Sequence, residues 1–99
     1  MSATFTKGMG GKFELGQLST TPGALEEFGQ IRILQCLTRH ANGDWGDLSD
    51  GDNKANDRAL SKKGDDRILS SYKLGENKTL WIITEADRST TTALLPEEY

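Results

Sequence analysis

The stretch that decides the fold is Ile68–Thr84, which reads ILSSYKLGENKTLWIIT. Two apolar runs flank Gly75–Asn77, a group of residues typical of the turn of a β-hairpin. Apolar residues occupy every position from Leu80 to Ile83, so both faces of the second strand are apolar. This pattern predicts a central strand in a sheet that a layer of helices covers on one face.

The residues on either side of the hairpin extend the sheet. Ala86–Ser89 contains turn-forming residues, and the threonine-rich segment Thr90–Leu95 favours a third strand. Pro96 is predicted to end that strand, because proline cannot donate a ladder hydrogen bond. Near the N-terminus, Phe13–Leu18 is a further strand candidate, although Gly16 weakens the pattern.

Helical signals precede the hairpin. Thr21 is predicted to cap a short helix over Ala24–Phe28 that Gly29 ends. A longer helix is predicted over Ile31–Ala41, and Asn42-Gly43 suits its C-cap because both residues tolerate a left-handed conformation. Apolar residues recur along it in two adjacent stripes, one through Ile31, Leu34, Leu37 and Ala41, the other through Ile33, Cys36, Leu37 and His40.

A third helix is expected from Ser49 or Asp50 to about Lys63, with Gly64 at its end. Its apolar content is thin, so we expect it to lie on the surface. Two to three helices followed by an antiparallel meander of three strands, with the N-terminal strand as a candidate addition, define an α+β fold. We expect a single domain over residues 12–99, preceded by a flexible leader over residues 1–11.

Composition excludes several classes of protein. The chain has 99 residues, with 12 Lys and Arg against 15 Asp and Glu, a net charge of −3. That balance is not expected of a protein that coats nucleic acid. No apolar stretch approaches the roughly 20 residues of a membrane span, and the first residues lack the apolar run of a secretory signal. A cytoplasmic protein with a free thiol at Cys36 is therefore the expectation.

The sequence predicts neither a metal nor a cofactor. Cys36 and His40 are four residues apart and share a helix face, but a structural zinc site needs about four protein ligands. The acidic residues between Asp44 and Asp52 fit no register of a calcium loop. Gly8–Lys12 lacks the first glycine and the final hydroxyl residue of a phosphate loop.

Two connections are candidate binding surfaces. Thr84–Thr92 carries two carboxylates, a guanidinium and five hydroxyls, and Asp87, Arg88 and Ser89 stand at its centre. These residues either form the turn or bind a ligand, with Arg88 holding a phosphate or carboxylate. The other connection contains Trp45 and Asp47, where the indole is either an anchor for a partner or a plug of the core.

Several pieces of the chain resemble a family of small uncharacterised bacterial proteins that are often found on plasmids and other mobile elements. These pieces are Thr21–Ala24, Arg39-His40 with Gly43–Gly46, Asn56–Leu60, Leu80–Ser89 and Leu94–Tyr99. The resemblance implies a small soluble accessory protein of a mobile genetic element. We expect it to act without catalysis by binding a protein, either a second copy of itself or a host protein.

The order of elements also has a looser likeness to barnase- and RelE-like ribonucleases, which need no metal. This alternative implies that His40 is the acid–base group, that Arg88 clamps the phosphate, and that Thr91 or Ser89 positions the substrate. Because the net charge disfavours RNA, it also needs a local patch of Arg39, Arg67 and Arg88. It predicts that His40, Arg88 and Thr91 converge on one open cleft.

Overall fold

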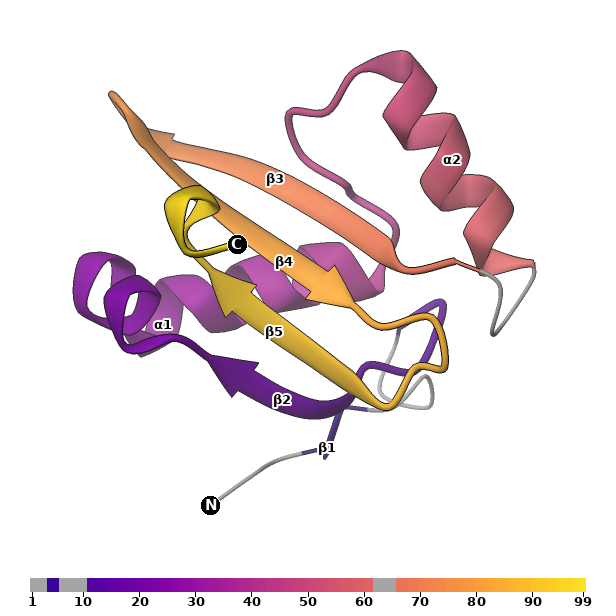
Figure 1. Ribbon diagram of the computed structural model, residues 1–99, viewed down its shortest axis with the longest axis horizontal. Coiled ribbons are helices and arrows are strands. Elements are labelled where there is room, and N and C mark those ends of the chain that lie inside the picture. The colour runs from indigo at the N-terminus through magenta and orange to yellow at the C-terminus, as the bar shows by residue number, and fades with distance from the viewer. Residues whose placement is uncertain (1–3, 6–10, 62–65) are drawn as a thin grey trace.

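The computed structural model describes residues 4–5, 11–61 and 66–99 of the chain. A five-stranded sheet in the order β1-β2-β5-β4-β3 carries helix α1 across one face, while α2 lies beyond β3 (Figure 1). The elements in chain order are β1 (Thr4–Phe5), β2 (Gly16–Thr20), α1 (Pro22–Ala41), α2 (Asp50–Leu60), β3 (Ile68–Gly75), β4 (Lys78–Thr84), β5 (Thr90–Leu94) and the short helix η2 (Pro96–Glu98).

The α+β class is confirmed, and the predicted antiparallel meander of three strands is matched in part, as one portion of a larger mixed sheet. β3 and β4 form an antiparallel hairpin, and β4 pairs antiparallel with β5. Asn77 in the hairpin turn has a φ of 57°, a conformation that asparagine adopts more readily than most residues. Leu80 and Ile82 are fully buried beneath α1, as expected of a central strand that a helix covers.

The sheet as a whole is mixed, because β2 pairs parallel with β5. The predicted strand Phe13–Leu18 is displaced: the observed strand begins at Gly16 and ends at Thr20. Gly16 has a φ of 67°, and a Cβ there would lie 2.3 Å from the Ser89 carbonyl oxygen. A glycine is therefore required where β2 approaches the start of β5.

The two predicted N-terminal helices are present as one element, α1, with a kink between them. Thr21 caps it by accepting a hydrogen bond from the Ala24 N–H at 3.2 Å. Gly29 interrupts the helix with φ 80° and ψ 160°, a region that is almost confined to glycine. The second apolar stripe, from Ile33 to His40, lies in the core. The first stripe joins the core only at Leu37 and Ala41, because Ile31 and Leu34 are 74% and 46% exposed.

Helix α2 begins at the predicted cap, where Ser49 Oγ accepts a hydrogen bond from the Asp52 N–H. It ends at Leu60, and the predicted end at Lys63 and Gly64 lies outside the described residues. Most of the leader over residues 1–11 is likewise outside them, but Thr4–Phe5 pairs with the first residues of β2. Among the described residues, no helix combines the length and apolar character needed to cross a membrane.

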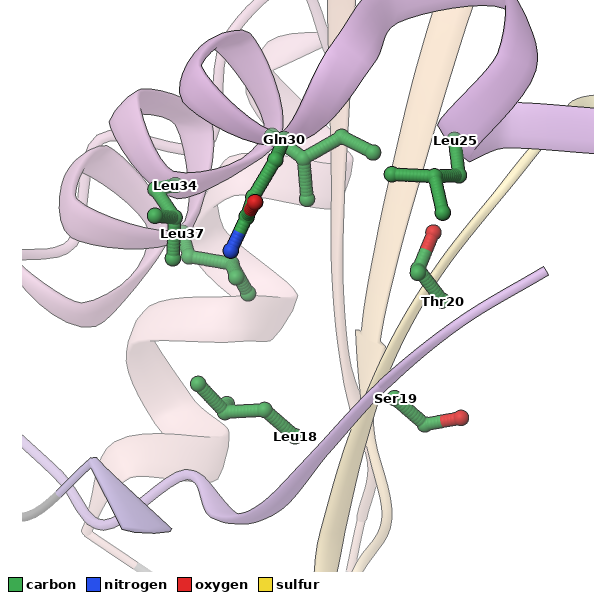
Figure 2. A pocket seen from close by; sticks show the side chains of 8 residues that line it. Leu18, Ser19, Thr20, Leu25, Gln30, Leu34 and Leu37 are labelled. Carbon is green, nitrogen blue, oxygen red and sulfur yellow. The ribbon is translucent and has the colours of Figure 1, made fainter. Parts of the chain in front are cut away.

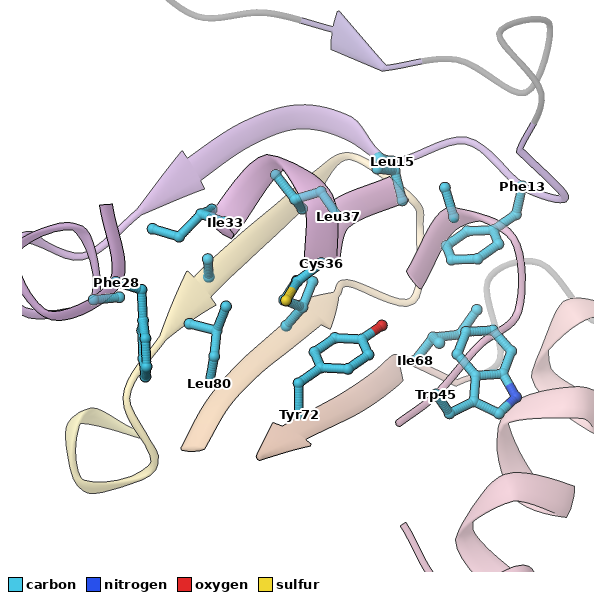
Figure 3. Packing of buried hydrophobic residues seen from close by; sticks show 14 of the residues in the cluster. Phe13, Leu15, Phe28, Ile33, Cys36, Leu37, Trp45, Ile68, Tyr72 and Leu80 are labelled. Carbon is cyan, nitrogen blue, oxygen red and sulfur yellow. The ribbon is translucent and has the colours of Figure 1, made fainter. Parts of the chain in front are cut away.

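The core lies between α1 and the sheet (Figure 3). Its aromatic end consists of Phe13, Trp45 and the His40 ring, with ring centroids 5.3 to 6.0 Å apart. Tyr72 is fully buried, and its hydroxyl donates to the Asp44 carbonyl at 2.7 Å. The loop that follows α1 is thereby attached to the core by the Trp45 ring and by the hydrogen bond from Tyr72 to Asp44.

Candidate functional site

His40 lies in the last turn of α1 and is completely buried. Its Nδ1 is 2.5 Å from Ser70 Oγ on β3, and its Nε2 is 2.9 Å from Thr84 Oγ1 on β4. Thr84 Oγ1 in turn lies 2.7 Å from Thr91 Oγ1 on β5. One imidazole therefore links α1 to three neighbouring strands through hydroxyl groups.

The donor and acceptor of each hydrogen bond in this network can be assigned by starting from Thr91. Thr91 donates its hydroxyl hydrogen to the Leu15 carbonyl, so it can only accept from Thr84. Thr84 must then accept from Nε2–H of His40, which leaves Nδ1 free to accept from Ser70. The network thus favours one neutral tautomer of the ring.

Burial opposes a charge on this ring and is the main cause that lowers the pKa of His40 from 6.5 to about 3, and the positive charge of Arg88 contributes the smaller part. A neutral imidazole that is enclosed on all sides cannot exchange protons with a substrate at neutral pH. The role that follows for His40 is to join the helix to the sheet.

Arg88 is also turned inward, with 5% of its surface exposed. Nη1 donates to the carbonyls of Asp66, Glu85 and Ala86 at 2.8, 3.2 and 2.9 Å, and Nη2 donates to Ala59 at 2.7 Å. Burial lowers the pKa of this guanidinium, and the negative charges of Asp66 and Asp87 oppose that lowering. Ala59 is in the last turn of α2, where a cation suits the helix dipole.

The three residues of the ribonuclease alternative are all internal. His40 and Thr91 have no exposed surface, and the donors of Arg88 are directed at backbone carbonyls. They therefore do not form the open cleft that this alternative requires. The arginine patch is also divided: Arg39 pairs with Asp44 at 2.7 Å, and Arg67 stacks on the Tyr99 ring.

The loop with Trp45 and Asp47 covers an edge of the sheet. Trp45 is 4% exposed and donates its indole N–H to Asp57 Oδ1 at 3.1 Å, so it is the core plug of the two predicted roles. Asp47 is exposed, but its N–H donates to the Ser71 carbonyl and its carboxylate accepts from the Lys73 N–H. The loop is thus occupied by contacts with β3.

Asn56 completes the cover of the β3 edge and was missed by the sequence interpretation. Its amide nitrogen donates to the Leu69 carbonyl at 2.7 Å, and its oxygen accepts from the Leu69 N–H at 3.2 Å. The side chain is 5% exposed although α2 is otherwise polar. A buried side-chain amide can form hydrogen bonds with the backbone of a strand edge. The sequence does not indicate which strand Asn56 contacts.

Asp87 and Ser89 remain at the surface of the turn between β4 and β5. The hydroxyl and the N–H of Ser89 both bind the Asp87 carboxylate and hold the pKa of that carboxyl below its usual range. The adjacent Arg88 has a φ of 61°, and its N–H donates to the Glu85 carbonyl. These contacts match the turn-forming interpretation of the segment.

The C-terminal residues also find their partners inside the chain. The Glu98 carboxylate accepts hydrogen bonds from Thr21 Oγ1 at 2.5 Å and from the Leu95 N–H at 2.8 Å. These bonds lower the pKa of Glu98, with the Thr21 hydroxyl as the main cause. A Cβ on Gly23 would lie 2.4 Å from the same carboxylate, which therefore sits against the first turn of α1, where negative charge is favoured.

An apolar cavity of about 210 Å³ lies between α1 and β2 (Figure 2). Leu18 and Thr20 line it from β2, Leu25 from the part of α1 before the kink, and Leu34 and Leu37 from the part after it. Gln30 is the polar residue at its helical side. The sequence indicates this additional apolar surface, because the helix carries two apolar stripes and one stripe is enough to face the core.

No family model, curated protein or solved structure matches this chain. Within residues 4–5, 11–61 and 66–99, no group of three His, Cys, Asp or Glu side chains is placed to hold a metal ion.

Proposed function

We propose that this chain is a small accessory protein that acts by binding another protein molecule, without catalysis, through the surface formed by β2 and α1. We call the residues Leu18, Thr20, Leu25, Ile31 and Leu34 the β2–α1 surface. The observation that carries the proposal is the apolar cavity bordered by exposed leucines. Concave apolar surfaces with exposed apolar rims are typical of interaction sites.

The exposure pattern supports this choice of surface. The exposed large apolar residues of the described chain are Leu25, Ile31, Leu34 and Tyr99, at 44%, 74%, 46% and 62%. Three of these four are on α1, and Tyr99 stacks on Trp81 and Arg67. Exposure of these three apolar side chains to water is unfavourable, and their burial against a partner would remove that cost.

Several polar side chains that could serve catalysis are engaged in structure. His40 is neutral and enclosed, Arg88 binds carbonyls, and the Cys36 thiol is buried, which raises its pKa. A reactive thiol would need a lowered pKa and exposure. The association with plasmids and other mobile elements is part of the proposal and is supported by the sequence resemblance alone.

A binding assay with matched variants tests the proposed function. The tagged chain captures its partner from a lysate of its native host. The partner is identified and purified, and its affinity for the chain is measured by calorimetry. Leu25→Glu places a carboxylate at the rim of the cavity, and Arg58→Glu is the control because Arg58 is exposed on α2. We expect Leu25→Glu to weaken binding at least tenfold and Arg58→Glu to leave it unchanged.

Equal affinities for both variants would contradict the proposal for this surface. Cleavage of RNA by the wild-type chain that is lost in His40→Ala would contradict the non-catalytic assignment. Circular dichroism of each variant establishes that a lost activity does not arise from unfolding.

A further inference from the structure

The last residues of the chain cross the side of the sheet that faces away from α1. Leu80 and Ile82 of β4 are buried beneath α1, and successive side chains of a strand alternate, so Trp81 points to the opposite side. Figure 1 shows α1 behind the sheet and the short helix η2 in front of it. Residues 95–99, which include η2, therefore lie on the Trp81 side, and we call them the strap.

The backbone bonds of the strap are separate from those of the sheet. The pairing of β5 with β4 ends at Leu94, directly before the strap. The Glu98 N–H donates to the Leu95 carbonyl at 2.9 Å. The Tyr99 N–H donates to the Pro96 carbonyl at 3.2 Å. Because both bonds join residues of the strap to each other, they can persist when the strap moves as a unit.

The Glu98 carboxylate attaches the strap to α1. Its Oε1 accepts hydrogen bonds from Thr21 Oγ1 at 2.5 Å and from the Leu95 N–H at 2.8 Å. Thr21 is the N-cap of α1, so the carboxylate also lies at the helix end where negative charge is favoured. Both hydrogen bonds are exposed to solvent, where they are weaker than in a protein interior. Water can therefore replace them at a low cost.

The Tyr99 side chain attaches the strap to the sheet. Its ring packs edge-to-face on the Trp81 ring with the centroids 5.8 Å apart, and the Arg67 guanidinium lies 5.0 Å from the Tyr99 centroid. The Tyr99 side chain is nevertheless 62% exposed. Aromatic and cation–π contacts at exposed sites each contribute little to stability, so this second attachment is also easily broken.

We propose that the strap opens and closes over the sheet while the rest of the chain stays folded, with Glu98 as its catch and Tyr99 as the cover of Trp81. A segment that is held by exposed hydrogen bonds and few buried contacts opens at a lower free energy than a core strand. In the open state the Trp81 ring is available to a ligand on this side of the sheet. The inference goes beyond the proposed function, because it concerns the side of the sheet opposite α1.

Native-state hydrogen exchange of the full chain, followed by nuclear magnetic resonance, tests the strap. The Leu95 N–H reports on the catch, because it donates to Glu98, and the Ile82 N–H on the central strand β4 reports on the core. We expect the Leu95 N–H to be protected relative to an unstructured peptide, and yet to exchange roughly a hundredfold or more faster than the Ile82 N–H.

Substitution of the catch should change this exchange selectively. Glu98→Gln should speed exchange at Leu95 about fivefold, because a neutral amide accepts weaker hydrogen bonds than a carboxylate and loses the attraction to the helix end. Glu97→Gln is the matched control, since it removes the same charge from the neighbouring exposed residue. We expect it to leave exchange at Leu95 unchanged. Exchange at Ile82 should be the same in both variants, which shows that the core is intact.

Substitution of the cover tests whether the strap moves as one unit. Tyr99→Ala should also speed exchange at Leu95 about fivefold, although the Tyr99 ring makes no bond with that N–H. Trp81→Leu should act in the same direction by removing the other ring of the pair. The double variant should exchange as fast as Tyr99→Ala alone, because the two rings contribute one shared contact.

Four results would overturn the inference. Exchange at Leu95 as slow as at Ile82 would show that the strap opens only when the whole chain unfolds. A Leu95 N–H without protection would show that the strap is never closed. Equal exchange in Glu98→Gln and Glu97→Gln would remove Glu98 as the catch. No effect of Tyr99→Ala at Leu95 would show that the strap does not move as one unit.

Discussion

Acidification should destabilise this protein well above the pH at which its carboxylates are neutralised, because of His40. In the folded chain burial holds the pKa of His40 at about 3, whereas the unfolded value is 6.5. The unfolded chain therefore binds a proton between these values that the folded chain does not. The stabilisation is complete above about pH 6.5 and is lost as the pH falls toward 3.

The magnitude follows from the same two values. Between pH 7.5 and pH 4.5 the loss is about 2.7 kcal/mol in total, and its slope approaches about 1.4 kcal/mol per pH unit below pH 6.5. His40 is the one histidine of the chain, so no other imidazole contributes in this interval. Asp44 and Asp87, whose pKa values are lowered in the folded state, lose their stabilising effect mainly at lower pH.

Urea unfolding at fixed ionic strength, followed by circular dichroism at pH 7.5 and pH 4.5, measures this loss. His40→Gln removes the titrating group and should make the free energy of unfolding nearly independent of pH over the same interval. Nuclear magnetic resonance of the wild-type imidazole should show no titration above pH 4.5. Equal stability of the wild type at both pH values, or an imidazole that titrates near 6.5 in the folded chain, would refute the reasoning.

Substitutions at four further positions test the fold by chemical denaturation. Arg88→Met should cost about 3 kcal/mol or more by removing charged donors to four carbonyls, and Arg88→Lys should restore little, because an ammonium lacks the planar fork of donors. Trp45→Ala should cost about 3–5 kcal/mol, whereas an exposed anchor would cost little. Gly46→Ala should prevent folding, because the added Cβ would lie 2.1 Å from the Ser71 carbonyl oxygen. A Cβ added at Gly29 would have no atom within 4 Å, so Gly29→Ala should cost only about 1–3 kcal/mol of backbone strain. A small effect of Gly46→Ala would show that the loop does not lie against β3.

The features predicted correctly from the sequence are those that depend on neighbouring residues. The hairpin depends on two apolar runs around a turn, and the caps at Thr21 and Ser49 depend on the next three residues. The parallel pairing of β2 with β5 joins segments about 70 residues apart, and no local pattern encodes it. Periodicity identifies the apolar stripe through Ile31 and Leu34 without saying what covers it, and the structure leaves these two residues exposed.

The candidate site shows the same division. The sequence directed attention to Arg88, but whether its guanidinium points inward depends on carbonyls at Ala59 and Asp66, which only the tertiary structure brings near. His40 was recognised as a residue near an apolar stripe, yet its two hydroxyl partners, Ser70 and Thr84, come from different strands. The position of β2 between β1 and β5 cannot be read from the sequence either, because it depends on strand order.

The central claim is that the chain makes its contacts with the β2–α1 surface while its polar residues serve the fold. Backbone amide chemical shifts recorded with and without the purified partner of the capture assay test it most directly. We expect the shifts of Leu18, Leu25 and Leu34 to change when the partner is added, and those of Trp45 and Ser89 to stay constant. Shifts that do not change on addition of the partner, or that change at Trp45 and Ser89 instead, would contradict it.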